Sequence, residues 1–143
     1  MYAYYAAIRN GTGRDIMIKL LIVDDEPLVQ IGIKSMLRWD ELGIEVCGTA
    51  MNGKAALEMI RQYRPDIVIT DIKMPVMNGL EASRQIRSLS RPDGNMIPIL
   101  AMTAQDAISV SSQCRQYGMD DYVLKPADPE QLTKMILKYV KTI

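Results

Sequence analysis

The chain has 143 residues, the length of one domain, and its 17 Lys and Arg balance its 17 Asp and Glu, so the formal net charge is zero. This balance argues against a basic nucleic-acid-binding arm and a polybasic membrane patch, because both need a clear positive excess. With no histidine and two cysteines, the sequence excludes a Ser-His-Asp triad, a histidine-ligated zinc site and a disulfide scaffold. Few cysteines and short apolar runs indicate a cytoplasmic protein without a transmembrane segment.

The first sixteen residues, MYAYYAAIRNGTGRDI, differ in character from the rest. Tyrosines and alanines precede the flexible Asn10-Gly11-Thr12-Gly13, and the stretch has no basic region and too short an apolar part for a signal peptide. We expect residues 1–16 to be a leader, an upstream linker or an expression remnant. Residues 17–143 are expected to form a single domain.

From Met17 onward, short apolar runs alternate with segments of helical periodicity. Runs rich in Ile and Val without alternation predict strands covered on both faces. These strands are expected at 18–23, 44–47, 67–69, 97–102 and 122–124. Apolar residues spaced three and four apart predict amphipathic helices. These stripes run over 29–37, 56–63 and 132–140, with helix starts at Pro27 and at Asp128-Pro129.

This alternation predicts an α/β protein, a parallel sheet with helices on both faces. Five strands are too few for an eight-stranded barrel, so the sheet is expected to be open. We expect a flavodoxin-like, doubly wound (βα)5 fold with strand order 2-1-3-4-5. In such a sheet ligands bind at the carboxyl ends of the strands, close to the point between strands 1 and 3.

Polar residues follow four of the predicted strands: Asp24 and Asp25, then Asp71, Thr103 and Lys125. In the order 2-1-3-4-5 these strands are neighbours, so their polar residues are expected to converge. Three close carboxylates call for a cation, and oxygen ligands favour Mg²⁺. An aspartate also serves as a phosphoryl acceptor. A phosphoryl on Asp71 would be neutralised by the metal, Lys125 and the Thr103 hydroxyl.

The segments LLIVDDEP, ITDIKMPVMNG, AMTA and DYVLKP occur in this order along the chain. Together they resemble the receiver domain of two-component response regulators, a chemotaxis-regulator-like fold, from Met17 to about Val140. The resemblance implies a signalling module and not an enzyme with a separate substrate. It implies phosphorylation on Asp71, with the phosphoryl taken from a sensor histidine kinase or a phosphotransfer protein.

The resemblance also implies how Mg²⁺ is bound. Asp25 and Asp71 would ligate the ion directly, together with the backbone carbonyl of Lys73, and Asp24 would act through water. Thr103 and Lys125 would bind the phosphoryl group.

A switch is implied as well, in which Thr103 moves toward the phosphoryl group and Tyr122 rotates into the vacated space. The resemblance also implies a cis peptide bond between Lys125 and Pro126. We expect the readout on the face formed by the fourth helix, the fifth strand and the fifth helix. The sequence leaves open whether a homodimer forms through this face.

Two side chains are expected to flank the path by which water attacks the acyl phosphate: Lys73, two residues after Asp71, and Gln105, two residues after Thr103. Neither offers a carboxylate to activate water. We expect Lys73 to shield the phosphoryl group and to lengthen its lifetime.

The sequence does not decide the protein context of the domain, and two other functions compete with that of a phosphorylated receiver. Residues 38–43, RWDELG, resemble receivers of Gram-positive regulators that carry a helix-turn-helix output, whereas residues 86–104 resemble receivers attached to hybrid sensor kinases. A pseudo-receiver that only docks partners is a remote alternative. A haloacid-dehalogenase-type phosphohydrolase is disfavoured, because Lys73 stands where that chemistry needs a carboxylate.

Overall fold

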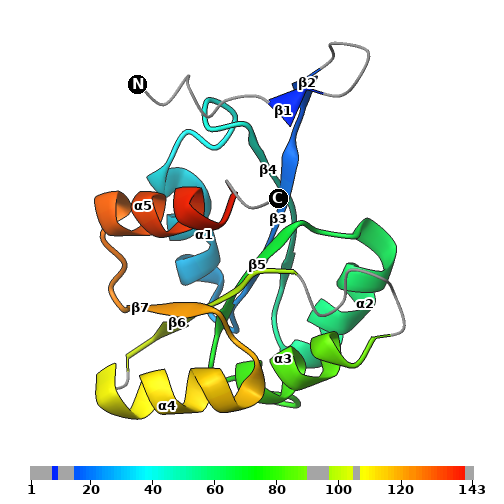
Figure 1. The fold of residues 1–143 in the computed structure, drawn as a ribbon, viewed down its shortest axis with the longest axis vertical. Coiled ribbons are helices and arrows are strands. Elements are labelled where there is room, and N and C mark those ends of the chain that lie inside the picture. The colour runs from blue at the N-terminus through cyan, green and yellow to red at the C-terminus, as the bar shows by residue number, and fades with distance from the viewer. Residues whose placement is uncertain (1–7, 10–14, 90–96, 105–106, 141–143) are drawn as a thin grey trace.

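The computed structural model of the protein describes residues 8–9, 15–89, 97–104 and 107–140. Five parallel strands form one sheet in the order β4-β3-β5-β6-β7 (Figure 1). Their bounds are Ile18–Val23 (β3), Ile44–Ala50 (β4), Ile67–Asp71 (β5), Ile99–Thr103 (β6) and Asp121–Leu124 (β7). Counted along the chain from β3, this order is 2-1-3-4-5, so the predicted flavodoxin-like fold is confirmed.

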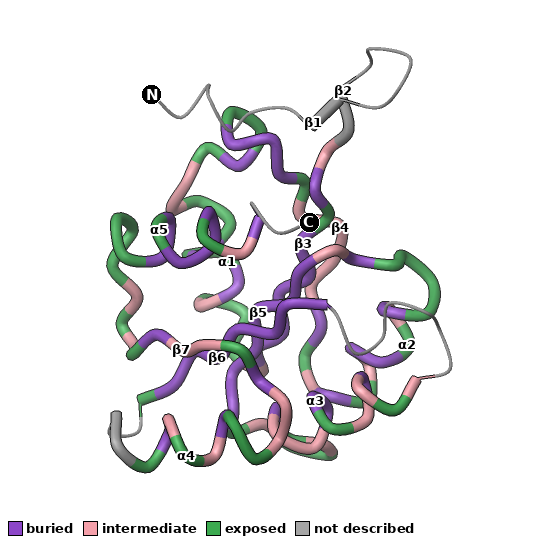
Figure 2. The backbone as a smooth tube through the Cα atoms, in the orientation of Figure 1, coloured by how far each residue is buried: buried purple, intermediate pink, exposed green. Residues whose placement is uncertain are grey.

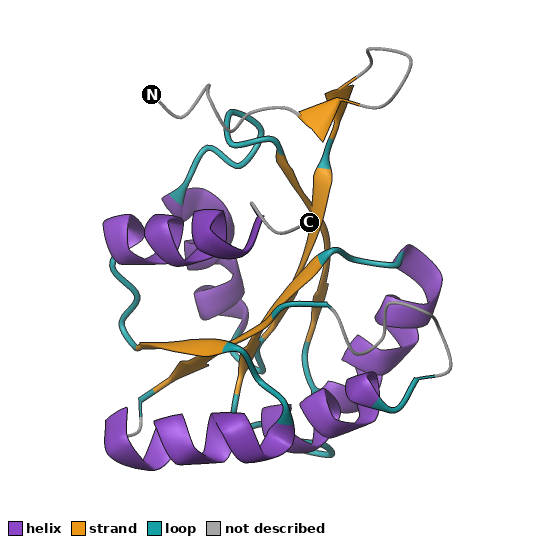
Figure 3. Cartoon of the chain, viewed as in Figure 1, coloured by secondary structure: helices purple, strands orange, loops and turns teal. Residues whose placement is uncertain are grey.

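Five helices cover the two faces of the sheet (Figure 3). Their bounds are Pro27–Met36 (α1), Gly53–Tyr63 (α2), Gly79–Arg87 (α3), Ala107–Tyr117 (α4) and Pro129–Val140 (α5). Apolar residues of α1 and α5 pack on one face, and those of α2, α3 and α4 pack on the other. Within the described part of the chain, no helix is both long and apolar enough to cross a membrane.

Consecutive residues of the central strands enter two different apolar cores. In β3, Leu20 and Ile22 join the core under α1 and α5, whereas Leu21 and Val23 join the core under α2, α3 and α4. All four are buried, as is most of the sheet (Figure 2). This two-sided burial explains why the strands read as continuous apolar runs in the sequence.

The edge strand β4 is three residues longer than the sequence pattern predicts, and it contains a bulge. Leu20 pairs with Val46, but the next residue, Leu21, pairs with Gly48, so Cys47 is the extra residue. The pairing then continues to the end of β3, where Val23 lies opposite Ala50.

Side-chain caps fix where three helices begin. The side chains of Asn52, Asn78 and Asp128 each accept a hydrogen bond from a backbone N–H in the first turn of the following helix, at 2.9 to 3.0 Å. Such caps satisfy N–H groups that have no partner within the helix. Asn78 thereby sets the start of α3, and with it the length of the loop that follows β5.

Two short strands, β1 (Ile8–Arg9) and β2 (Asp15–Ile16), form a separate antiparallel pair. They lie within the segment that the sequence sets apart from the domain.

Candidate functional site

A cleft of about 460 Å³ opens at the carboxyl ends of β3, β5, β6 and β7. Its lining includes Asp25, Glu26, Asp71, Lys73, Thr103 and Lys125. The polar residues predicted to converge from four strand ends therefore do meet at one edge of the sheet.

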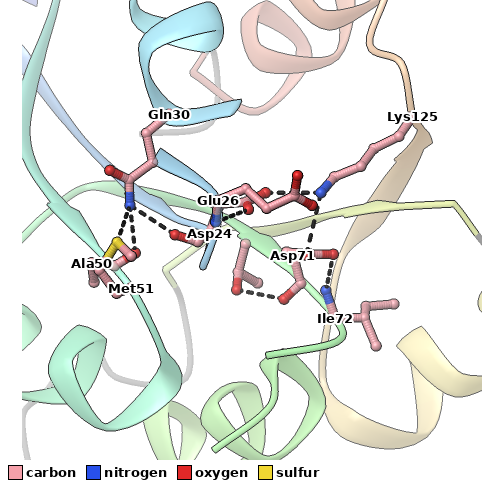
Figure 4. Close-up of polar contacts among 9 residues, drawn as sticks. Asp24, Glu26, Gln30, Ala50, Met51, Asp71, Ile72 and Lys125 are labelled. Carbon is pink, nitrogen blue, oxygen red and sulfur yellow. Dashed lines mark hydrogen bonds and ion pairs between the residues drawn. The ribbon is translucent and has the colours of Figure 1, made fainter. Parts of the chain in front are cut away.

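Asp24 lies at the base of this edge and is only 1% exposed. Its backbone N–H donates to the Ala50 carbonyl at 2.9 Å, which continues the pairing of β3 with β4. One carboxylate oxygen, Oδ1, accepts from the Glu26 N–H at 2.9 Å, and the other, Oδ2, accepts from Lys125 Nζ at 2.9 Å (Figure 4). Both carboxylate oxygens of this buried group are therefore hydrogen-bonded.

Asp71 ends β5, and 8% of its surface is exposed. Its Oδ1 accepts from the Ile72 N–H at 2.8 Å, and Lys125 Nζ lies 3.2 Å from its Oδ2 (Figure 4). Burial raises the pKa of the Asp71 carboxyl above its ordinary value, and the nearby charge of Asp24 adds to this shift, although Lys125 opposes it. Asp71 is thus a carboxylate whose negative charge is only partly compensated.

Lys125 bridges the two aspartates. Burial by itself would lower the pKa of the Lys125 ammonium, but its hydrogen bond to Asp24 and the charge of Asp71 outweigh burial and raise that pKa. The Lys125 backbone N–H donates to the Thr103 carbonyl at 2.8 Å, and the peptide bond to Pro126 is cis. The cis bond agrees with what the family resemblance implies.

The residues that follow β3 form an acidic loop, which we define as Asp24, Asp25 and Glu26. Carboxylate oxygens of these three residues lie within 4.8 Å of one another. With Asp71 in the same cleft, the donor set consists of hard oxygen atoms, which suits Mg²⁺ better than a softer transition metal. The four carboxylates in and beside the cleft outnumber its two ammonium groups, those of Lys125 and Lys73, so the residues present fit a divalent cation.

The other predicted site residues occupy different environments. Thr103 is buried at 2% exposure and lines the cleft, and Lys73 lines the same cleft with an exposed side chain. Tyr122 is half-buried and packs against the core under α2, α3 and α4. Gln105 lies outside the described residues.

Close backbone packing holds the loop after Asp71. The Gly79 N–H donates to the Ile72 carbonyl at 2.8 Å, and a Cβ at Gly79 would overlap the carbonyl oxygen of Asp71. On the other side, the Gly53 N–H at the start of α2 donates to the Met77 carbonyl at 2.8 Å. The backbone around Asp71 is therefore fixed by two neighbouring helices.

Sequence reasoning missed Gln30, a buried polar residue of α1 whose side-chain Nε2 donates to the carbonyls of Asp24 and Ala50. One signal was present. Gln30 lies three residues before the buried Ile33 and so falls on the apolar stripe of its helix, where a polar side chain needs buried partners.

The sequence of this domain matches a known protein family. A family model described as the response regulator receiver domain matches residues 20–137. The chain belongs to the response regulator receiver domain family. This receiver domain is 33% identical over 116 residues to the uncharacterized transcriptional regulatory protein YesN of Bacillus subtilis, over 81% of this chain and 30% of that protein.

Solved structures agree with this assignment. The receiver (REC) domain of the response regulator AraT from Geobacillus stearothermophilus is 31% identical and superimposes with a TM-score of 0.79, covering 89% of this chain and 95% of that one. The receiver domain of a sensor histidine kinase from Pseudomonas aeruginosa, which has a magnesium ion coordinated in its active-site cleft, is 31% identical with a TM-score of 0.75, covering 87% and 98%. The chain spans 30 to 45% of the length of three curated relatives that it matches.

Proposed function

We propose that this receiver domain accepts a phosphoryl group on Asp71 in a reaction that requires Mg²⁺. One observation carries the proposal: the Lys125 ammonium contacts both Asp24 and Asp71 at the base of an acidic cleft. A buried carboxylate that faces a cation and a cluster of oxygen ligands is suited to receive a phosphoryl group, because the charge of that group needs fixed partners.

In this proposal Asp25 and Asp71 bind Mg²⁺ directly, together with the backbone carbonyl of Lys73, and Asp24 binds it through water. When bound, the metal would neutralise negative charge on the phosphoryl oxygens. Supporting this assignment, Asp25, Asp71 and Lys73 line the same cleft, and the carboxylates of Asp24 and Asp25 lie close together.

The transfer step is a substitution at phosphorus. A carboxylate oxygen of Asp71 attacks the phosphorus of a phosphohistidine outside this domain, the new O–P bond forms, and the N–P bond breaks. The leaving imidazole takes a proton from solvent. Because these 143 residues contain no histidine, the phosphohistidine lies outside this domain, and we propose that it belongs to a sensor histidine kinase or a phosphotransfer protein. The domain assists this transfer and the later hydrolysis of its own aspartyl phosphate by water, and we assign it no other substrate.

We further propose that phosphorylation is read out on the α4–β7–α5 face. Thr103 lies at the end of β6 and Tyr122 in the adjacent β7, where Ala101 pairs with Tyr122 and Thr103 with Leu124. A phosphoryl oxygen that attracts the Thr103 hydroxyl would favour one of two arrangements of these neighbouring strands. Homodimer formation through this face is part of the proposal, and direct binding of nucleic acid by this domain is not.

Beryllofluoride, which mimics a phosphoryl group, tests the readout. Chemical shifts of the full chain are compared with and without it in the presence of Mg²⁺. We expect changes in α4, β7 and α5 in addition to the cleft, whereas changes confined to α1 and α2 would refute the proposed face.

A labelling experiment tests the phosphorylation itself. The full chain is incubated with a small acyl phosphate donor and MgCl₂, and acid-labile phosphate on the protein is measured. Wild type is expected to be labelled, and a chelator or the substitution Asp71→Asn is expected to abolish the label. Asp40→Asn, which removes an exposed carboxylate after α1, is the matched control and should be labelled like wild type. Stoichiometric labelling of Asp71→Asn would disprove the assignment.

The chain context is also a proposal. Relatives include transcriptional regulators and receiver domains of sensor histidine kinases, so the parent is either a response regulator or a hybrid kinase. In both cases we propose that the domain works in the cytoplasm.

A further inference from the structure

Gln30 is a polar residue on the buried face of α1, and only 9% of its surface is exposed. Its side-chain Nε2 donates to the Asp24 carbonyl at 2.7 Å and to the Ala50 carbonyl at 3.0 Å, and the Met51 sulfur lies 3.5 Å away (Figure 4). A side-chain amide has two N–H groups, so the two carbonyls use its full donor capacity. The amide therefore joins three segments: α1, the end of β3 and the end of β4.

The two carbonyls lie where the pairing of β3 with β4 ends. Val23 and Ala50 are the last paired residues, and the Asp24 N–H still donates to the Ala50 carbonyl at 2.9 Å. The next carbonyl, that of Asp24, lies beyond the last residue of β3. Inside a sheet, a backbone N–H of the neighbouring strand would donate to such a carbonyl. Here the side-chain amide of Gln30 is the donor instead.

We propose that Gln30 is a positioning residue for the acidic loop, holding its backbone in the geometry that binds a divalent cation. The proposal rests on the proposed function, of which it specifies the metal site. Asp24, Asp25 and Glu26 carry adjacent negative charges that repel one another when the cation is absent. Because the Gln30 amide on α1 holds the backbone of the loop, the three carboxylates cannot move apart. Less reorganisation of the loop is therefore needed when the cation binds.

The contacts of Gln30 distinguish this role from simple filling of space. Its carbon chain would be replaced equally well by methionine, which has a similar length and no donor. If only packing matters, Gln30→Met should bind Mg²⁺ as wild type does. If the two hydrogen bonds position the loop, the same variant should bind Mg²⁺ more weakly.

The test is a calorimetric titration of the full, unphosphorylated chain with MgCl₂. Gln30→Met is expected to weaken Mg²⁺ binding about 10-fold, the size typical of losing a hydrogen bond behind a metal ligand. Gln85→Met is the matched control, because Gln85 lies in α3 and its side chain makes a 3.4 Å hydrogen bond to Glu81. It should bind Mg²⁺ within about twofold of wild type. Equal affinities of wild type and Gln30→Met would overturn the proposal.

A second variant covers the case in which Gln30→Met does not fold. Gln30→Asn keeps an amide but places it one methylene short of the carbonyls, so it too is expected to weaken Mg²⁺ binding. Wild-type affinity in Gln30→Asn would overturn the proposal. If wild type itself binds no Mg²⁺, the proposed function fails, which is a different result from equal affinities.

Hydrogen exchange in the metal-free protein gives a readout that does not depend on metal. The Glu26 N–H is held by the Asp24 carboxylate within the acidic loop. Its exchange should be faster in Gln30→Met than in wild type, and unchanged in Gln85→Met. Unchanged exchange in Gln30→Met would contradict the positioning role.

Discussion

Lys125 and Asp24 lie 101 residues apart in the sequence, yet Lys125 Nζ donates to Asp24 Oδ2 at 2.9 Å. The carboxylate is 1% exposed and the lysine side chain 18% exposed, so the ion pair is largely shielded from water. The same ammonium lies 3.2 Å from Asp71 Oδ2. One cation thus compensates two buried carboxylates from two neighbouring strands, and the charge balance of the cleft depends on it.

The first prediction concerns pH and Asp71. Burial raises the pKa of Asp71 above its ordinary value of 3.8, so the folded protein holds this proton more tightly than the unfolded chain. Ionised Asp71 therefore costs stability at every pH above the folded-state pKa, and this cost is absent below 3.8. Asp71→Asn should raise the unfolding free energy of the metal-free protein at neutral pH, because the asparagine side chain carries no charge to bury.

Urea titrations in chelator between about pH 3 and pH 8 measure this effect. The difference between Asp71→Asn and wild type should shrink as the pH falls, because both side chains are then uncharged. Asp40→Asn serves as the exposed control. A difference that is absent at neutral pH, or that stays constant down to acid pH, contradicts the prediction.

The second prediction compares two glycines. A Cβ at Gly79 would overlap the Asp71 carbonyl oxygen, whereas a Cβ at Gly32, in the middle of α1, would meet nothing within 4 Å. Gly79→Ala should therefore lower the unfolding free energy by about 2 kcal/mol or more and reduce labelling of Asp71. Gly32→Ala should raise it by about 0.5 to 1 kcal/mol, because alanine favours a helix. Thermal or urea unfolding of both variants decides the matter, and equal effects would contradict it.

The third prediction concerns Val76 in the loop after Asp71. Its φ is 67°, a left-handed conformation that is unfavourable for a β-branched residue, and its side chain is 79% exposed. Val76→Gly and Val76→Asn should both raise the unfolding free energy, by about 0.5 to 1 kcal/mol, since both residues adopt this conformation more readily. Chemical denaturation measures the change. Destabilisation by both variants would show that the valine side chain contributes contacts that outweigh the backbone cost.

The fourth prediction concerns Arg87 at the end of α3. Its guanidinium donates to the carbonyls of Ile97 at 2.7 Å and Gly118 at 2.9 Å, and it contacts the Asp120 carboxylate at 2.9 Å. Because this geometry uses the planar fork of arginine, both Arg87→Met and Arg87→Lys should destabilise the protein, by about 2 kcal/mol.

Arg38→Met is the control for Arg87, since the Arg38 ion pair with Glu41 is 3.4 Å long and largely exposed. It should cost less than about 0.5 kcal/mol. A lysine at position 87 that restores wild-type stability would show that charge alone suffices there.

The fifth prediction concerns the lifetime of the phosphorylated state. Lys73 lines the cleft with an exposed, cationic side chain, which we expect to lie over the phosphoryl group and exclude water. Lys73→Ala and Gln105→Glu should both speed the decay of phosphorylated protein after the donor is removed, the first by opening the path of water and the second by adding a general base. Unchanged decay in both variants would mean that other groups set the lifetime.

Much of this architecture follows from the sequence because the two-sided sheet produces long apolar runs. The order of the strands and the meeting of Asp24, Asp71 and Lys125 were predictable from this pattern together with the connection rules. The end of β4 was not, because Gly48 and Thr49 are half-exposed on an edge strand and carry no apolar signal. The closeness of Gly79 to Asp71 is a tertiary contact that no local pattern encodes.

The role of Gln30 was also hidden, for a different reason. Val29, Ile33, Met36 and Leu37 define the apolar stripe of α1, and a polar residue beside them does not change the amphipathic pattern that predicts the helix. Its partners are backbone carbonyls, and such acceptors have no signature in the sequence.

The bulge at Cys47 determines which residue of β4 lies opposite the end of β3, next to the acidic loop. If the same residues paired without a bulge, Thr49 would lie opposite Val23, and the carbonyl now shared by the Asp24 N–H and Gln30 would belong to a different residue. The two halves of this edge strand therefore differ in their tolerance of length changes. A residue gained or lost before the bulge can be accommodated there. One gained or lost between Gly48 and Ala50 would place a different carbonyl, or none, where the Asp24 N–H and the Gln30 amide now donate.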